Sequence, residues 1–245
     1  MNLVVDIGNT LFKAAFFKNK SLKLFVSGKT VKDLINNKQF ISLLKKTESV
    51  IYSNVSKQNI QELLKLLPKK ARCFAVEKNI KLPITINYQN KKTLGTDRIA
   101  SAVGALSKYK GHLLVIDIGS CIKYNIISDK REFLGGAISP GLQMRFNALH
   151  QFTGKLPLLK LTKHKVPVLG KDTKSNLQSG VINGCISEIN YFIDIFEQQY
   201  RKRLTIVVTG GDASFFIKHI KRKVFLQPRL IILGLNEILN YQLEK

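Results

Sequence analysis

Two short segments carry the residue types best suited to binding phosphate. Asp6-Ile7-Gly8-Asn9-Thr10 and Asp117-Ile118-Gly119-Ser120 each place a carboxylate after an apolar run and before a glycine. The glycine allows a sharp turn that brings backbone N–H groups close to phosphate oxygens, and the carboxylate suits a hard cation that bridges those oxygens. A single Asp-x-Gly also marks ordinary hairpins, but two matched copies predict a nucleotide-phosphate site.

The sequence around these loops is repeated. Leu3 to Thr10 aligns with Leu114 to Cys121 at an offset of 111 residues. We therefore expect two homologous domains, 1–110 and 111–245, with the acidic loops on opposite sides of one cleft, where ligand sites between domains commonly lie.

A third polar segment, Gly95-Thr96-Asp97-Arg98, precedes an apolar helical pattern. Asp97 could cap that helix by accepting from its first N–H groups, or it could be a general base beside an arginine that anchors an anion. Both interpretations are open on these residues alone. Gly135 to Gly141 and Thr209-Gly210-Gly211-Asp212 are read as glycine-rich turns that let the backbone pass close to a ligand. His150 is assigned no role.

Periodicity predicts the elements that position these segments, with strands and helices alternating in an α/β fold. Strands are predicted over 2–6, 11–17, 49–52, 73–76, 112–118, 123–128 and 204–208, with a further core segment at 230–234 before a last helix. Helices are predicted over 60–67, from just after Arg98 to 106, and over 178–200. Gly180 and Gly184 in the last of these predict close approach of a neighbouring element.

Composition excludes several classes of protein. The 245 residues carry a net charge of +24, but the lysines are scattered and no nucleic-acid recognition signature accompanies them, so nucleic acid is not the expected partner. Cys73, Cys121 and Cys185 form no metal-binding cluster and suit a reducing compartment. Without a leader pattern or a long uncharged apolar run, the expectation is a soluble cytoplasmic protein with no membrane contact.

Taken in order, these segments, together with Lys155-Leu156-Pro157 and Gly170-Lys171-Asp172-Thr173, resemble the type III pantothenate kinases over nearly the whole chain. The resemblance implies a fold of two duplicated ribonuclease H-like (actin-like ATPase) domains with mixed sheets flanked by helices. It also implies a homodimer that transfers the γ-phosphate of ATP to pantothenate in coenzyme A synthesis, with magnesium and a monovalent cation, potassium or ammonium.

The resemblance assigns roles residue by residue. Asp97 is the implied catalytic base, Asp117 the ligand of the monovalent cation, and Asp6 a magnesium ligand, either directly or through water. The implied ATP-binding residues are Asp6, Ile7, Gly8, Asn9, Thr10, Leu11, Phe12, Lys13 and Ser120. The implied pantothenate-binding residues are Tyr88, Gly95, Thr96, Asp97, Arg98 and Thr173.

The chain departs from the family pattern beside the second loop. Where the family usually reads D-x-G-T-x-x-T-x-D, this chain has Ser120 for the first Thr, Lys123 for the second and Asn125 for the last Asp. Ser120 keeps the hydroxyl. Lys123 either replaces the cation, by pairing with phosphate or Asp117, or blocks the site and marks a loss of activity.

Two other functions remain alternatives. The chain could be a catalytically weakened regulatory or accessory protein on the same fold, which could bind nucleic acid through its positive charge. It could also be a kinase for another small alcohol. A substrate panel and a salt-dependent nucleic-acid binding test separate them.

Overall fold

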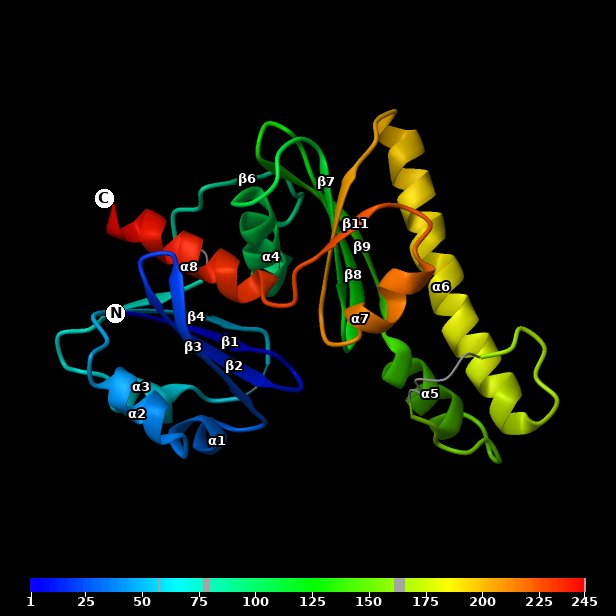
Figure 1. The fold of residues 1–245 in the computed structure, drawn as a ribbon, viewed down its shortest axis with the longest axis horizontal. Coiled ribbons are helices and arrows are strands. Elements are labelled where there is room, and N and C mark those ends of the chain that lie inside the picture. Colours follow the sequence, from blue (N-terminus) through cyan, green and yellow to red (C-terminus); the bar gives the residue numbers. More distant parts are fainter. Residues whose placement is uncertain (57, 77–79, 161–165, 245) are drawn as a thin grey trace. The chain divides into compact units, whose positions relative to one another are not determined.

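The computed structural model describes residues 1–56, 58–76, 80–160 and 166–244. Its chain forms two compact units, drawn in Figure 1. The first comprises residues 1–109, 130–134 and 229–245, and the second residues 110–129 and 135–228. Among the described residues, no helix combines the length and apolar character needed to cross a membrane.

The first unit is built on a mixed sheet in the order β3-β2-β1-β4-β5. Its strands are β1 (Asn2–Ile7), β2 (Phe12–Lys18), β3 (Ser21–Gly28), β4 (Ser49–Asn54) and β5 (Arg72–Ala75). β1 pairs antiparallel with β2 and parallel with β4, so it is central and nearly all of its residues are buried. The strands predicted over 2–6 and 11–17, which form an antiparallel hairpin, and those around residues 49–52 and 73–76 are confirmed.

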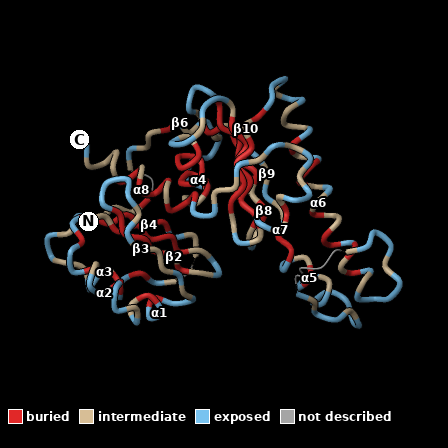
Figure 2. Tube along the Cα trace, viewed as in Figure 1, coloured by how far each residue is buried: buried red, intermediate tan, exposed pale blue. Residues whose placement is uncertain are grey.

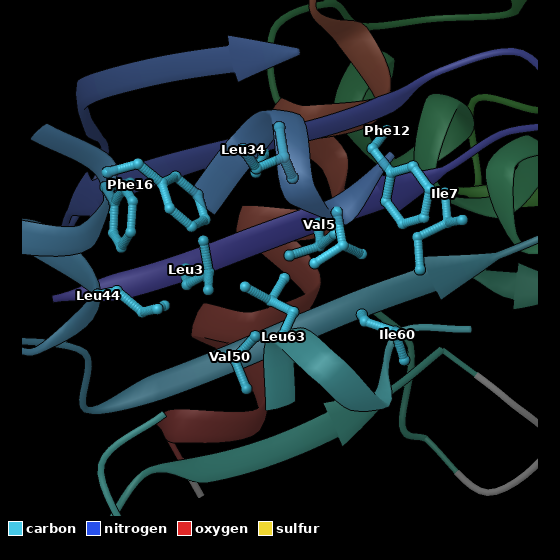
Figure 3. Packing of buried hydrophobic residues seen from close by; sticks show 13 residues of the cluster. Leu3, Val5, Ile7, Phe12, Phe16, Leu34, Leu44, Val50, Ile60 and Leu63 are labelled. Atoms are coloured by element: carbon cyan, nitrogen blue, oxygen red, sulfur yellow. The ribbon is translucent and has the colours of Figure 1, made fainter. Parts of the chain in front are cut away.

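Helices bury one face of this sheet. α1 (Val31–Ile35), α2 (Lys38–Leu44) and α3 (Gln61–Lys65) contribute Leu34, Phe40 and Leu63 to a cluster that also contains alternate residues of β1. Figure 3 shows Leu34 and Leu63 in this cluster, and the buried parts of the trace are red in Figure 2. Leu3, Val5 and Ile7 belong to this cluster because alternate residues of a strand point to the same face.

A pair of glycines brings two other helices of the first unit together. α4 (Thr96–Leu106) packs against α8 (Leu230–Leu243). A Cβ at Gly104 would overlap the carbonyl oxygen of Leu230, and a Cβ at Gly234 would overlap that of Ala100. Residues 230–234, predicted as a separate core segment before the last helix, are instead the first turns of α8, because a short apolar run suits a buried helix as well as a strand.

The second sheet, in the order β11-β10-β7-β8-β9-β6, lies mostly in the second unit. The strands are β7 (Leu113–Ile118), β8 (Cys121–Ile127), β9 (Glu132–Pro140), β10 (Thr205–Thr209) and β11 (Val224–Leu226). β7 and β8 form an antiparallel hairpin and β10 runs parallel to β7, which repeats the pattern of β2, β1 and β4 and confirms these predicted strands. In the first unit, β6 (Thr85–Ile86) pairs with Glu132 and Phe133 at the beginning of β9.

Gly135 and Gly136 lie inside β9 and do not form the predicted turn. Both have positive φ angles, 127° and 147°, and a Cβ at Gly136 would overlap the carbonyl oxygen of Tyr124 on β8. These glycines therefore allow an unusual strand conformation and a close approach to the neighbouring strand.

α6 (Thr173–Tyr200) is the longest helix of the second unit and packs on the sheet through Phe192, whose ring centroid lies 4.5 Å from that of Tyr124. The helix confirms and extends the prediction for 178–200. No described atom lies within 4 Å of a Cβ built at Gly180 or Gly184, so the predicted close approach at these glycines is wrong for the described residues. The unit also contains α5 (Leu142–Gln151) and α7 (Ala213–Phe216). The described residues include two short 3₁₀ turns, η1 (Lys91–Thr93) in the first unit and η2 (Ile217–His219) in the second.

Candidate active site

The first acidic loop is the turn between β1 and β2. Gly8 N–H donates to the carbonyl oxygen of Leu11 at 3.1 Å, which closes the turn and leaves Asn9 and Thr10 exposed. Ile7 and Phe12 have their side chains in the hydrophobic cluster, so any contact of these two residues with nucleotide is through their backbone. The loop thus presents backbone N–H groups and small polar side chains, the groups that bind phosphate oxygens.

A lysine lies directly opposite the carboxylate of this loop. Asp6 and Lys13 are paired residues of β1 and β2, and Lys13 Nζ lies 3.7 Å from Asp6 Oδ2. The Asp6 side chain is only 4% exposed, whereas that of Lys13 is 36% exposed. In this arrangement the buried carboxylate can bind magnesium, and the more exposed ammonium group beside it can bind the phosphate.

The donor set fits magnesium bound with its nucleotide. Mg²⁺ usually keeps several waters and takes one or two carboxylates plus phosphate oxygens, so it needs no cage of protein ligands. Asp6 supplies a hard oxygen donor. Among the described residues there is no group of three or more His, Cys, Asp or Glu side chains that would hold a metal ion alone.

Gly95 is the N-cap of α4 and Thr96, Asp97 and Arg98 are its first residues, so the helix begins earlier than the predicted position just after Arg98. Asp97 Oδ1 accepts a hydrogen bond from Arg98 N–H at 2.9 Å. Gly95 allows this arrangement, because a Cβ there would approach the same Asp97 oxygen to 2.6 Å. Asp97 therefore lies inside the first turn of α4, whose N-cap is Gly95 and has no side-chain capping bond, and it is half-buried.

Ser53 connects this turn to the phosphate loop. It is the neighbour of Asp6 in the parallel pairing of β1 and β4, and its hydroxyl lies 2.7 Å from that of Thr96. Ser53 is 1% exposed. The structure therefore brings Asp6 and Thr96 into one region of the first unit. Ser53 was missed in the sequence, where it is an ordinary strand residue.

Tyr88 and Arg98 meet on a common aromatic ring. Arg98 Cζ lies 5.3 Å from the centroid of the Phe133 ring, and the Tyr88 ring lies 6.1 Å from it, edge to face. Phe133 is fully buried and Arg98 nearly so. The contact with the ring face holds the guanidinium in place and attracts its charge. No sequence signal marked Phe133, which follows Tyr88 by more than forty residues.

The second acidic loop contains a tighter version of the same pair. Asp117 and Lys123 are partners in β7 and β8, and Lys123 Nζ lies 2.7 Å from Asp117 Oδ2. This distance is that of a charge-assisted hydrogen bond. The residues present do not fit the expected monovalent cation, because the carboxylate that would bind it already holds an ammonium group.

Glycine-rich segments gather around this loop within the second unit. Gly141 N–H donates to the carbonyl oxygen of Ser120 at 3.1 Å, and Asp212 N–H donates to that of Ile118 at 3.0 Å. Gly210 has a φ of 101°, and a Cβ there would overlap Ile118. Burial raises the pKa of Asp212. The sequence marked these segments separately but gave no indication that they meet.

Thr173 lies elsewhere in the second unit, at the beginning of α6. It borders a cavity of about 860 Å³ between α5 and α6. The other lining residues are mostly apolar, among them Met144, Leu149, Leu156 and Leu177.

Glu188 of α6 ties the glycine-rich part of β9 to its surroundings. Its carboxylate accepts from Tyr124 Oη at 2.9 Å, from Ser139 Oγ at 2.5 Å and from the Arg145 guanidinium at 2.5 Å. Burial alone would raise the pKa of Glu188, but these three hydrogen bonds outweigh burial and lower it. The network fixes the segment that leads to Gly141.

The fold of the chain is similar to that of solved proteins described as sugar kinases. A protein described as an N-acetylmannosamine kinase from Listeria monocytogenes superposes with a TM-score of 0.57, at 15% identity, over 100% of this chain and 99% of that one. A protein described as a Baf family transcriptional activator from Campylobacter jejuni gives a TM-score of 0.61 at 23% identity, over 99% and 100%. The predicted α/β fold class is confirmed.

Sequence comparison identifies the family. The family model for type III pantothenate kinases matches residues 2–195. A type III pantothenate kinase from Cytophaga hutchinsonii is 38% identical over 98% of this chain and 99% of its own length, and one from Porphyromonas gingivalis is 36% identical over 98% of both. The chain belongs to the type III pantothenate kinase family, as its motifs predicted, and that family is one of phosphotransferases.

Proposed function

We propose that this chain transfers the γ-phosphate of ATP to the terminal hydroxyl of pantothenate, the first step of coenzyme A synthesis. The hydroxyl oxygen forms a bond to the γ-phosphorus, the bond from that phosphorus to the bridging oxygen breaks, and ADP leaves. The hydroxyl proton passes to Asp97. The observation that carries the proposal is the juxtaposition, in one unit of a family member, of the Asp6 loop, the Asp97 turn and the Arg98–Phe133–Tyr88 cluster.

Each part of the first unit then has a task. The exposed turn at Asn9 and Thr10, with Lys13, binds phosphate oxygens, and Asp6 holds magnesium, directly or through water. Magnesium, when bound with ATP, offsets the charge on the transferring group. Arg98 binds the pantothenate carboxylate, because its guanidinium is held on Phe133 and matches a carboxylate in shape.

Asp97 acts mainly by orienting the hydroxyl. In a loose transition state the proton leaves late, so a base within hydrogen-bond reach aligns the nucleophile more than it activates it. Its contact with Arg98 N–H holds the carboxylate at the beginning of α4. Gly95, Thr96 and Tyr88 complete the substrate contacts, together with Thr173. Ser120 contacts ATP.

The test is an assay of ADP release with and without pantothenate, on the wild type and on Asp97→Asn. Loss of the base is expected to lower kcat by about 10² to 10⁴-fold. Asp33→Asn is the matched control, because Asp33 belongs to the capping box of α1, where its side chain accepts from Thr30 N–H, and an asparagine oxygen can accept the same bond. ATP consumption that does not depend on pantothenate, or an equal loss of kcat in both variants, would contradict the proposal.

We also propose a cytoplasmic homodimer. Several large apolar side chains of the second unit are exposed, including Met144 beside the α5–α6 cavity. Such exposed apolar surface is typical of an interface. Light scattering after gel filtration tests this proposal, and Met144→Lys is expected to weaken the dimer if this surface forms it.

An accessory role is the second candidate, because a net charge of +24 favours contact with nucleic acid. It predicts salt-dependent retention of nucleic acid without pantothenate-dependent ADP release. Kinase activity with no such retention would exclude it.

A further inference from the structure

We infer that the Lys123 ammonium takes the place of the monovalent cation at Asp117, so that this chain binds ATP and turns over without added potassium or ammonium. The inference rests on the proposed kinase function and concerns how the second acidic loop is charged.

The first argument is position. Lys123 stands directly across from Asp117 in the β7–β8 pairing, where cross-strand Cβ atoms are about 4.5–5.5 Å apart. A lysine side chain spans that gap, and the 2.7 Å distance shows the ammonium in direct contact with the carboxylate. A second cation on the same oxygen would face a like charge at close range.

The second argument is burial. The Asp117 side chain is 11% exposed and that of Lys123 is 18% exposed. A carboxylate this far from water requires a compensating positive charge. Lys123 supplies it from within the chain.

The third argument is charge balance along β8. Lys123 and Asn125 are two residues apart and so lie on the same face of the strand, and Asn125 is fully buried. Relative to the family pattern, the lysine adds one positive charge and the asparagine removes one negative charge. Both changes act in the direction that makes a bound cation unnecessary.

The fourth argument is chemical likeness. Potassium and ammonium are the ions that the family resemblance implies, and a lysine side chain ends in an alkylammonium group. Tethering gives this group a high effective concentration beside Asp117. The first unit already contains such a pair, Asp6 with Lys13 at equivalent positions of its hairpin.

The experiment compares potassium chloride with tetramethylammonium chloride at equal ionic strength, because tetramethylammonium is too large to bind in place of potassium. The readouts are ATP affinity by calorimetry, the thermal unfolding midpoint and pantothenate-dependent ADP release. For the wild type, ATP affinity and kcat are expected to agree within twofold between the two salts. A tenfold or larger gain in ATP affinity or in kcat on adding potassium overturns the inference.

Two variants make the test specific. Lys123→Thr with Asn125→Asp restores the family pattern, and its ATP affinity is expected to rise at least tenfold with potassium. Lys123→Met keeps the length without the charge, and its ATP affinity is expected to fall at least tenfold and to stay low in either salt. Lys130→Ala, at an exposed lysine, is the control and should match the wild type. Equal potassium responses of the double variant and the wild type count against the inference.

The comparison of the two salts on the wild type tests the inference even if a variant fails to fold. ATP affinity is measured without pantothenate, so it tests Lys123 independently of the acceptor. Absence of pantothenate-dependent ADP release in both salts, with unchanged ATP affinity, would refute the proposed substrate while leaving the role of Lys123 supported.

Discussion

Replacing Gly234 with alanine tests how the catalytic turn is held. Gly234 of α8 lies against Ala100 of α4, and α4 begins with the turn that carries Asp97. In a helix interior, glycine to alanine alone favours folding by about 1 kcal/mol. Here, however, the new methyl would overlap the carbonyl oxygen of Ala100, a backbone atom that cannot rotate away.

This overlap determines whether Gly234→Ala stabilises or destabilises the protein. Inserting a methyl group into a packed contact costs about 1–3 kcal/mol, and we take the upper end because both partners are backbone. Subtracting the propensity gain leaves a net destabilisation of about 2 kcal/mol. For a chain of this size each kcal/mol lowers the unfolding midpoint by roughly 2–4 °C, so a fall of about 4–8 °C is expected.

Thermal unfolding followed by circular dichroism measures this change, and Gly180→Ala provides the matched control. Gly180 is also in a helix, but no described atom lies within 4 Å of its added Cβ, so the midpoint should rise by a few degrees. Because the two helices must separate, kcat/KM of Gly234→Ala should also fall, by about 10²-fold for a 1 Å shift of the turn. Equal or higher stability of Gly234→Ala would refute the described crossing.

Three other predictions concern the site. Ser53→Ala removes the hydroxyl contact with Thr96, and we expect a destabilisation of about 1 kcal/mol together with a lower kcat/KM, measured by urea unfolding and ADP release. Arg98→Lys loses the planar guanidinium, so KM for pantothenate should rise more than kcat falls, whereas KM for ATP stays unchanged. The pKa of Glu188 is lowered in the folded state, so this residue stabilises the fold at pH values above its unfolded pKa of about 4.3. This stabilisation is lost as the pH falls through the folded pKa. Urea unfolding at pH 3 to 7 should show this loss in the wild type and a weaker one in Glu188→Gln.

Local sequence patterns were sufficient to predict the hairpin that occurs in both units. The two hairpins were predicted because an apolar strand, an Asp-x-Gly turn and a second apolar strand occur in sequence within each. Contacts between distant helices were not predictable in this way. The spacing of Gly180 and Gly184 suggested a close approach, yet the tight crossing is made by Gly104 and Gly234, one on each of two helices far apart in sequence. A sequence shows which residues are small but not which helix faces meet.

The same limit applies to the site. Asp6, Asp97 and Arg98 were predicted from motifs, and Tyr88 from the family resemblance. Ser53 and Phe133, which link them, were not, because a serine in a strand and a phenylalanine in an apolar run have no distinctive local pattern. Their roles follow from strand pairing and ring contacts, which join positions that are dozens of residues apart.

The two Asp–Lys pairs show what strand register adds to a motif. In the sequence Lys123 is a departure from the family, and Lys13 is part of the phosphate loop. The hairpins differ by one residue in their turns, yet each lysine stands opposite its aspartate. The pair in the first unit is looser and its lysine more exposed, so that lysine is available to phosphate. The pair in the second unit is closed at 2.7 Å, so its lysine neutralises the carboxylate, and the same cross-strand position therefore supports two different tasks.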